Sequence, residues 1–154
     1  MKLELVRDWM THDVVTVTPD VTLPRADELM VAHTIRRLPV VTADGRLVGI
    51  VTYGDIRSAR PSRASSLSIW EANYLLARLP VAEIMTKIPV TVSQDATIGE
   101  AAYLMLQNMI SGLPVIDNQG GLVGIITESD IFRMVVRDWM HTRGEPLQPY
   151  AHYT

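Results

Sequence analysis

The chain contains one sequence pattern twice. LVGIVTYGDI at residues 47–56 returns as LVGIITESDI at residues 122–131, and the shift of 75 positions between them (122 against 47) aligns the flanking residues without a gap. VTV at 15–17 then falls on VTV at 90–92, and LPV at 38–40 falls on LPV at 113–115. About two in five positions match over a span of about 50 residues. A duplication in constant register indicates two copies of one supersecondary unit.

Each copy predicts the same order of elements: a strand, a helix, two strands and a second helix. VVTV at 14–17 is short and β-branched, which suits a strand. From Thr22 onward the apolar residues follow the i, i+3, i+4 spacing of one helix face. LPVV and LVGIVT suit two strands that are joined by a tight turn at Asp44-Gly45. Thr52 followed three positions later by Asp55 is typical of a helix N-terminus, where each side chain caps the other residue's amide.

The size of one copy predicts that the two copies form a single module. A body of about 55 residues buries too small a share of its surface to be stable alone, so we expect the copies to pack against each other. The predicted boundaries are 1–60 for copy one, 61–79 for a linker loop and helix, 80–140 for copy two and 141–154 for a C-terminal tail. The linker helix is expected to begin after Ser68, because Glu71 completes a capping box.

Composition argues against several classes of protein. The chain has 154 residues, of which 47% are apolar and 20% charged, as in one globular domain. It has no cysteine, and its four histidines are scattered, so we expect neither a disulfide nor a metal centre. A formal net charge of -3 argues against a nucleic-acid polymer as partner. The N-terminal residues do not resemble a signal peptide and no run resembles a membrane span, so a cytoplasmic location is expected.

The duplicated unit resembles tandem CBS domains, the regulatory repeats of the cystathionine beta-synthase type. The resemblance rests on LPV after the first helix and on the ending G-apolar-apolar-T-x-x-D in both copies, and it covers about residues 6–137. It implies an α+β fold of two β-α-β-β-α repeats, packed through their sheets with pseudo-twofold symmetry into a Bateman module. It also implies two clefts between the repeats, a ligand such as AMP, ADP, ATP or another adenosyl compound, and a homodimer.

The resemblance further implies which residues line the clefts. The first cleft would comprise Ile50, Thr52, Asp55, Val90, Thr91, Ile110, Ser111 and Pro114. The second would comprise Ile125, Thr127, Asp130, Val15, Thr16, Ile35, Arg36, Arg37 and Pro39. In the family the aspartate accepts hydrogen bonds from ribose hydroxyls, the threonine meets phosphate, and the apolar residues sandwich the base. Helix N-terminal amides favour an anion at such a place.

Each of these assignments has a simpler alternative. The threonine and aspartate pairs can serve as helix caps alone, although capping and ligand contact can coexist. Arg36 and Arg37 precede LPV in copy one where Ser111 and Gly112 precede it in copy two. We therefore predict tighter phosphate binding in the second cleft, with no guanidinium at that place in the first. The alternative is a solvated arginine pair at a helix end.

The sequence contains no nucleophile motif, phosphate loop or zinc-protease pattern, so we expect a binding protein, not an enzyme, with no required cofactor. The predicted function is a stand-alone sensor that binds an adenine nucleotide or other adenosyl ligand and signals to an unidentified effector protein. The alternative is a ligand-free scaffold that dimerises and docks another protein. VRDWM at 6–10 recurs at 136–140, outside the 75-residue register, and we hypothesise that Trp9 and Trp139 form a subunit interface.

Overall fold

The computed structural model describes residues 4–60 and 66–144. In chain order the elements are α1 (Val6–Trp9), α2 (Leu23–His33), β1 (Arg37–Val41), β2 (Leu47–Thr52), α3 (Tyr53–Ser58), α4 (Ile69–Arg78), the 3-10 helix η1 (Val81–Glu83), β3 (Thr86–Lys87), β4 (Val92–Ser93), α5 (Ile98–Asn108), β5 (Gly112–Ile116), β6 (Leu122–Thr127) and α6 (Glu128–Arg143). Among them, no helix is both long and apolar enough to cross a lipid bilayer.

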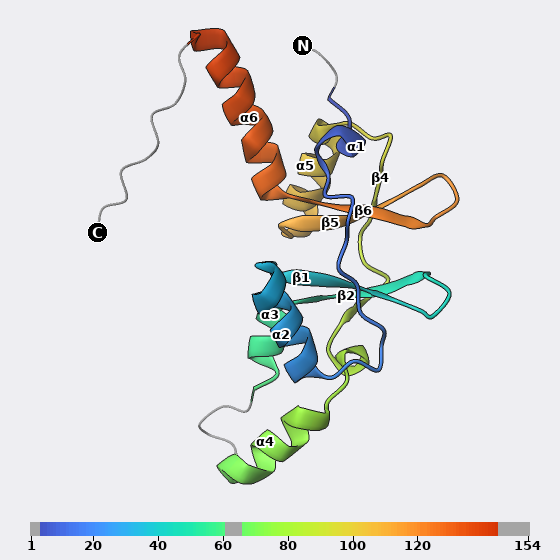
Figure 1. Cartoon of the computed structure of the whole chain (residues 1–154), viewed down its shortest axis with the longest axis vertical. Coiled ribbons are helices and arrows are strands. Elements are labelled where there is room, and N and C mark those ends of the chain that lie inside the picture. The colour runs from blue at the N-terminus through green and yellow to red at the C-terminus, as the bar shows by residue number, and fades with distance from the viewer. Residues whose placement is uncertain (1–3, 61–65, 145–154) are drawn as a thin grey trace, which may run out of the picture.

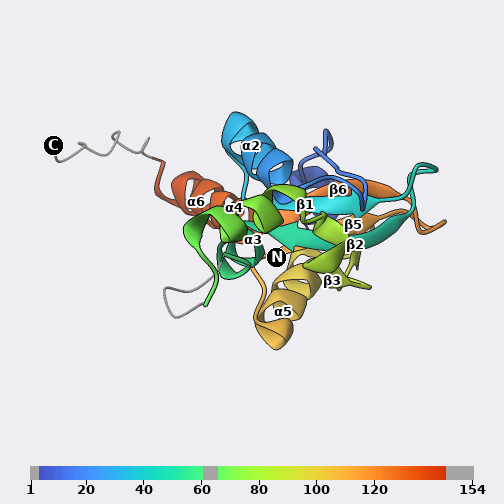
Figure 2. The same cartoon turned by 90° about the horizontal axis from the view of Figure 1, so that it is seen from below.

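Two small sheets carry the duplication into the tertiary structure. One sheet has the order β1-β2-β3 and the other the order β4-β5-β6. The two hairpins have the same register, since Pro39 lies opposite Ile50 and Pro114 lies opposite Ile125. Figures 1 and 2 show one sheet stacked beside the other, with both hairpin turns on one side of the molecule and α2, α3 and α6 toward the other. The α+β fold of two packed repeats is thereby confirmed.

The tight turn predicted at Asp44-Gly45 is present, and the second copy has its counterpart. Gly45 and Gly120 lie in the two hairpin turns with φ of 82° and 80°, in the left-handed region that suits glycine. The linker helix also begins as predicted: Ser68 is the N-cap of α4, and the Glu71 amide donates to Ser68 Oγ at 3.2 Å.

The first strand expected in each copy is much shorter than the sequence suggests. In copy one only Val17 forms a bridge, to Val40, and in copy two β4 has two residues. The preceding residues, among them Val15 and Val90, run along the clefts described below. In both copies the β-branched run therefore forms extended chain, and most of its residues do not pair in a sheet.

The two copies exchange their leading segments. Thr11 bridges Ile125 of β6, and the matching Thr86 of β3 pairs with Ile50 of β2. Each sheet is therefore closed at one edge by chain from the other copy. Figure 1 shows this crossing, with α1 beside α5 and the start of α6.

The exchange continues into the apolar cores. The first core contains Val17, Leu23, Ala26, Met30, Leu38, Val40, Val51, Ile56 and Val81. The second core contains Val6, Met10, Val92, Ile98, Ala101, Met105, Leu113, Val115 and Ile126. Val6 and Val81 hold matching positions in the duplication, and both are 0% exposed. We call the bodies around these cores the first half and the second half.

Two glycines permit this close crossing of segments. A Cβ at Gly124 would lie 2.5 Å from Met10 Sδ and 2.9 Å from the Thr11 carbonyl oxygen. A Cβ at the matching Gly49 would lie 2.5 Å from Met85 Sδ. The glycine in both LVGI motifs is therefore explained by packing, because the exchanged segment lies directly on it.

Candidate functional site

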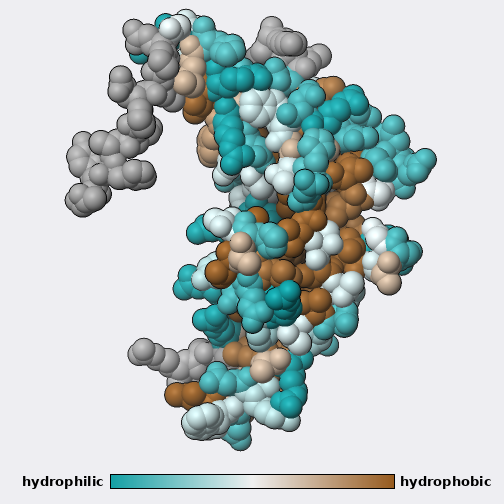
Figure 3. All heavy atoms as spheres, in the orientation of Figure 1, coloured by the Kyte–Doolittle hydropathy of each residue, from teal (hydrophilic) through white to brown (hydrophobic). Residues whose placement is uncertain are grey.

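Two clefts lie where the halves meet, and each is lined by residues of both copies. The first cleft, beside Thr52 and Asp55, has a volume of about 560 Å³. The second cleft, beside Thr127 and Asp130, has a volume of about 420 Å³. Figure 3 shows apolar side chains gathered around the boundary of the two halves on the face in view. Both volumes are in the range of small-molecule sites.

Most of the residues assigned to the clefts lie on their walls. The structure places Ile50, Thr52, Asp55, Val90, Ile110, Ser111 and Pro114 on the first cleft. It places Ile125, Thr127, Asp130, Val15, Ile35, Arg36 and Arg37 on the second cleft. Thr16, Thr91 and Pro39 are not among the lining residues, and Pro39 is fully buried.

The threonine and aspartate of the first cleft cap α3. The Thr52 amide donates to Asp55 Oδ2 at 2.8 Å, and the Asp55 amide donates to Thr52 Oγ1 at 3.1 Å. This is a reciprocal capping box, which holds both side chains in fixed positions at the cleft. Thr52 and Asp55 therefore form a helix cap, as the simpler interpretation predicts. The same cap also orients a hydroxyl and a carboxylate at the cleft wall.

The second cleft repeats the cap and adds an ion pair. The Thr127 amide donates to Asp130 Oδ2 at 2.8 Å. Arg133 Nη1 donates to Asp130 Oδ1 at 2.6 Å, and Asp130 is only 3% exposed. The matching position in copy one is Ser58, which carries no charge. A ribose that approached Asp130 would compete with a guanidinium that approaches from solvent.

Arg37 lies between the two clefts. It donates from Nη1 to the Ser111 carbonyl oxygen at 3.0 Å and from Nη2 to Ser111 Oγ at 2.6 Å. A Cβ at Gly112 would lie 2.2 Å from Arg37 Nη1, so the guanidinium occupies space that only glycine leaves open. Burial and, more weakly, Arg36 lower the pKa of Arg37, whereas the charges of Glu128 and Asp130 raise it.

The prediction that Arg36 and Arg37 serve the second cleft and not the first is wrong. Arg36 and Arg37 line both clefts, so the first cleft has the same two guanidiniums within reach as the second. The sequence hid this because both residues belong to copy one, whereas the structure brings them close to the boundary of the halves. The predicted preference of phosphate for the second cleft loses its basis.

The sequence analysis did not identify several charged residues that line the clefts. Arg57 lines the first cleft, while Asp13, Glu128 and Arg133 line the second. Glu128 directly follows the capping threonine and Arg133 lies one helical turn beyond Asp130, so position alone could have found them. The position of Asp13 in the sequence does not indicate the second cleft, because Asp13 reaches that cleft only through the exchange of leading segments.

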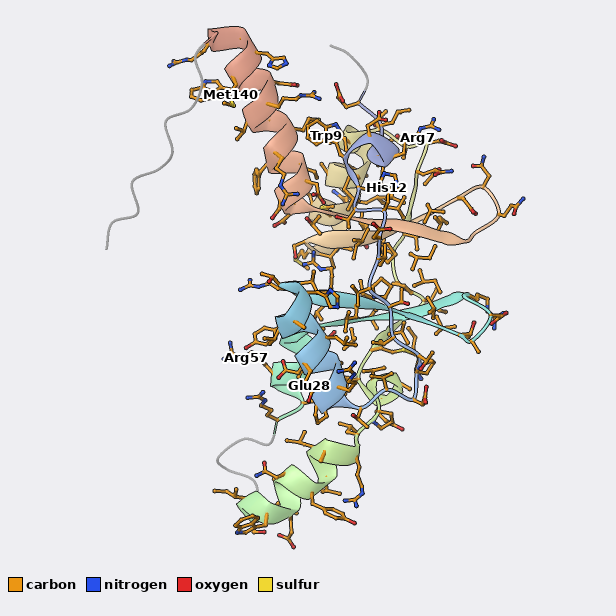
Figure 4. All side chains as sticks on the ribbon, viewed as in Figure 1. Arg7, Trp9, His12, Glu28, Arg57 and Met140 are labelled. Atoms are coloured by element: carbon orange, nitrogen blue, oxygen red, sulfur yellow. The ribbon has the colours of Figure 1, made fainter. Side chains whose placement is uncertain are left out.

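The repeated VRDWM segment has two unequal environments. Trp9 Nε1 donates to Glu4 Oε2 at 2.9 Å, and Arg137 Nη2 donates to Glu4 Oε1 at 3.0 Å. The Arg137 guanidinium also lies 4.5 Å from the Trp9 ring centroid, so α1 and α6 are joined within the chain. Figure 4 shows Trp9 next to α6. Trp139, in contrast, is 45% exposed.

Metal binding finds no support in the described residues. No group of three or more histidine, cysteine, aspartate or glutamate side chains is placed to hold an ion there.

Comparison with known proteins identifies related chains. The CBS domain family matches residues 6–62 and 81–137. A CBS domain-containing protein of Dictyostelium discoideum is 36% identical over 133 residues, which make up 86% of this chain and 92% of that protein. An inosine-5'-monophosphate dehydrogenase of Mycobacterium tuberculosis is 37% identical over 139 residues, which make up 90% of this chain and 22% of the dehydrogenase. The chain thus spans most of one relative and a small part of the other.

Solved structures share the arrangement of the two halves. The CBS domain pair of protein MJ0100, in complex with 5'-methylthioadenosine and S-adenosyl-L-methionine, has a TM-score of 0.75 at 29% identity and covers 89% of this chain and 99% of that chain. CBSX2 of Arabidopsis thaliana has also been solved, and its complex with AMP has a TM-score of 0.73 at 28% identity over 88% of this chain and 98% of that chain.

Proposed function

The chain belongs to the CBS domain family, and from that premise we propose that it is a regulatory module that binds an adenosyl ligand in its two clefts. One observation carries the proposal. In each cleft a capping threonine and aspartate from one copy are combined with apolar wall residues from the other copy. The MJ0100 pair and CBSX2, which share the fold, were solved with adenosyl compounds.

The residues of the clefts supply each kind of contact that such a ligand needs. The aspartate carboxylate accepts hydrogen bonds from the ribose diol, and nearby helix amides donate to a phosphate or other polar 5' group. The Thr52 hydroxyl donates to that group as well, whereas Thr127 Oγ1 already donates to Asp130 Oδ2 at 3.0 Å. Ile110 and Val90 in the first cleft, and Ile35 and Val15 in the second, provide apolar surface for the base. These groups bind and orient a ligand, and we assign the module no reaction of its own.

A thermal shift panel tests the proposal. AMP, ADP, ATP, 5'-methylthioadenosine and S-adenosylmethionine are each added to the full chain. A ligand at 100 times its dissociation constant stabilises the native state by about 2.7 kcal/mol, which raises the melting temperature by roughly 5–10 °C for a chain of this size. The rival function, a ligand-free scaffold, predicts no shift with any member of the panel.

A matched pair of variants separates ligand contact from capping. Thr52→Ala removes a capping box at the first cleft, and Thr97→Ala removes a capping box at the start of α5, where the residue lines neither cleft. Both changes should destabilise the free protein by about 0.5–2 kcal/mol. Only Thr52→Ala should weaken binding in the first cleft. Equal ligand affinity in the two variants would show that the threonine acts as a cap alone.

We also propose that two copies associate as a homodimer through the helices. Large apolar side chains are exposed on neighbouring helices, with Leu106 of α5 77% exposed and Phe132 of α6 65% exposed. An exposed apolar surface of this kind marks an interaction site. Light scattering of the wild type should give the mass of a dimer, and Leu106→Glu should lower it. A monomeric mass for the wild type at micromolar concentration would refute this part.

A further inference from the structure

The two clefts differ in the charge of their walls, and we propose that they take adenosyl ligands of different charge. The first cleft takes the phosphate-bearing ligand, and the second takes one whose 5' substituent is neutral or cationic, such as a thioether or a sulfonium. This inference rests on the proposed function and names the ligand class of each cleft.

The wall charges follow directly from the lining residues. Both clefts share Arg36 and Arg37. The first cleft adds Arg57 and has one acidic residue, Asp55, so its formal charge is three positive minus one negative, or +2. The second cleft adds one arginine and three acidic residues, so its formal charge is zero. Its three acidic residues are Asp13, Glu128 and Asp130.

The difference arises at positions where the duplicated copies diverge. Glu128 is matched by Tyr53, so an acidic residue beside the capping threonine in copy two is an aromatic residue in copy one. Asp13 is matched by Ile88, and Arg57 is matched by Phe132. Each of these three substitutions makes the first cleft more positive than the second by one charge, and a fourth, Ser58 against Arg133, offsets one of them.

Each cleft has one arginine that the other lacks, and these two arginines differ in whether a carboxylate already pairs with them. In the second cleft Arg133 is paired with Asp130 at 2.6 Å, so its charge is already balanced. In the first cleft the Arg57 guanidinium lies 5.8 Å from the Tyr53 ring centroid, and within residues 4–60 and 66–144 it forms no ion pair with a carboxylate. Figure 4 shows Arg57 reaching outward from the first half. Arg57 is therefore free to meet a phosphate group.

The shared Arg37 is balanced from one side only. The carboxylates whose charges act on Arg37 are Glu128 and Asp130, and both line the second cleft. A phosphate in the second cleft would lie close to Glu128 and would be repelled by it, whereas the charge of Asp130 is balanced by Arg133. A sulfonium at the same place would be attracted, because a unit charge interacts with a carboxylate a few ångströms away by an amount that changes affinity about tenfold or more at a partly screened site.

Three probes with one adenosyl group and different 5' charge test the assignment: ADP, 5'-methylthioadenosine and S-adenosylmethionine. Binding to the full chain is measured by isothermal titration calorimetry. The variants are Arg57→Gln for the first cleft, Arg133→Gln as its matched control in the second, and the double change Asp13→Asn with Glu128→Gln. All four side chains are exposed, and melting curves verify that each variant folds.

We expect Arg57→Gln to weaken ADP binding about tenfold and to leave S-adenosylmethionine unchanged. The double change should weaken S-adenosylmethionine about tenfold and should let ADP bind at a second site. Binding of 5'-methylthioadenosine should change less than twofold in either variant.

Two results would overturn the inference alone: ADP weakened by Arg133→Gln but not by Arg57→Gln, or S-adenosylmethionine unaffected by loss of both acidic residues. Failure of all three probes to bind the wild type would overturn the proposed function as well.

Discussion

Replacing Val6 with alanine tests the exchange of leading segments on which both clefts depend. Val6 is 0% exposed and belongs to the core of the second half, although it precedes all of the first half in the chain. Val81 is its counterpart in the core of the first half, also 0% exposed, and Val81→Ala is the matched variant.

The expected loss of stability follows from the burial. Each change removes two buried carbon groups, which contribute about 1.6 kcal/mol at about 0.8 kcal/mol each, and the cavity left behind adds to this. We expect each variant to lose about 2 kcal/mol of unfolding free energy in urea denaturation. For a chain of about 150 residues this lowers the melting temperature by roughly 4–8 °C.

A double-mutant cycle then identifies the core in which Val6 lies. Ile98 belongs to the second core and Leu23, its counterpart in the duplication, belongs to the first. Val6→Ala should couple to Ile98→Ala by about 0.5 kcal/mol or more and should be additive with Leu23→Ala, because residues in different cores share no contacts. Coupling to Leu23 together with additivity to Ile98 would refute the exchange.

Two further predictions concern crossing points and caps. Gly124→Ala should destabilise the chain by about 1–3 kcal/mol in chemical denaturation, because its Cβ would lie 2.5 Å from Met10 Sδ; a stability equal to wild type would contradict this packing. The Glu100 pKa is lowered from 4.5 by hydrogen bonds from the Thr97 amide and hydroxyl. Its stabilising contribution is therefore complete above the unfolded pKa and disappears as pH falls through the lower folded pKa. Glu100→Gln should accordingly be less stable than wild type at neutral pH and should lose that difference in acid, and a difference that persisted at the lowest pH would contradict the assignment.

Much of the fold could be read from local pattern. The capping signals at Thr52 and Ser68, and the turn glycine Gly45, have the roles that the sequence predicted, because caps and tight turns depend on a few neighbouring residues. The β-branched runs at 14–17 and 90–92 were less reliable, because strand formation depends on a partner that is distant in the chain.

In the candidate site too, local features could be predicted from the sequence and long-range ones could not. The sequence located the capping threonine and aspartate of each copy, and the family resemblance placed most of the apolar wall. The resemblance assigned Arg37 to one cleft, whereas the structure places Arg37 beside both clefts. The resemblance also missed Asp13, which reaches its cleft only because the leading segment crosses to the other half.

By itself, then, the sequence determined that there are two copies of one unit, where their helices begin and where their chains turn, since these features depend on contacts within a few residues. Only the tertiary structure decided which copy closes which sheet and which charges face each cleft. Those outcomes depend on residues far apart in the chain that meet when the halves pack together, such as Ile50 with Thr86 and Thr11 with Ile125, and no local pattern encodes such a meeting.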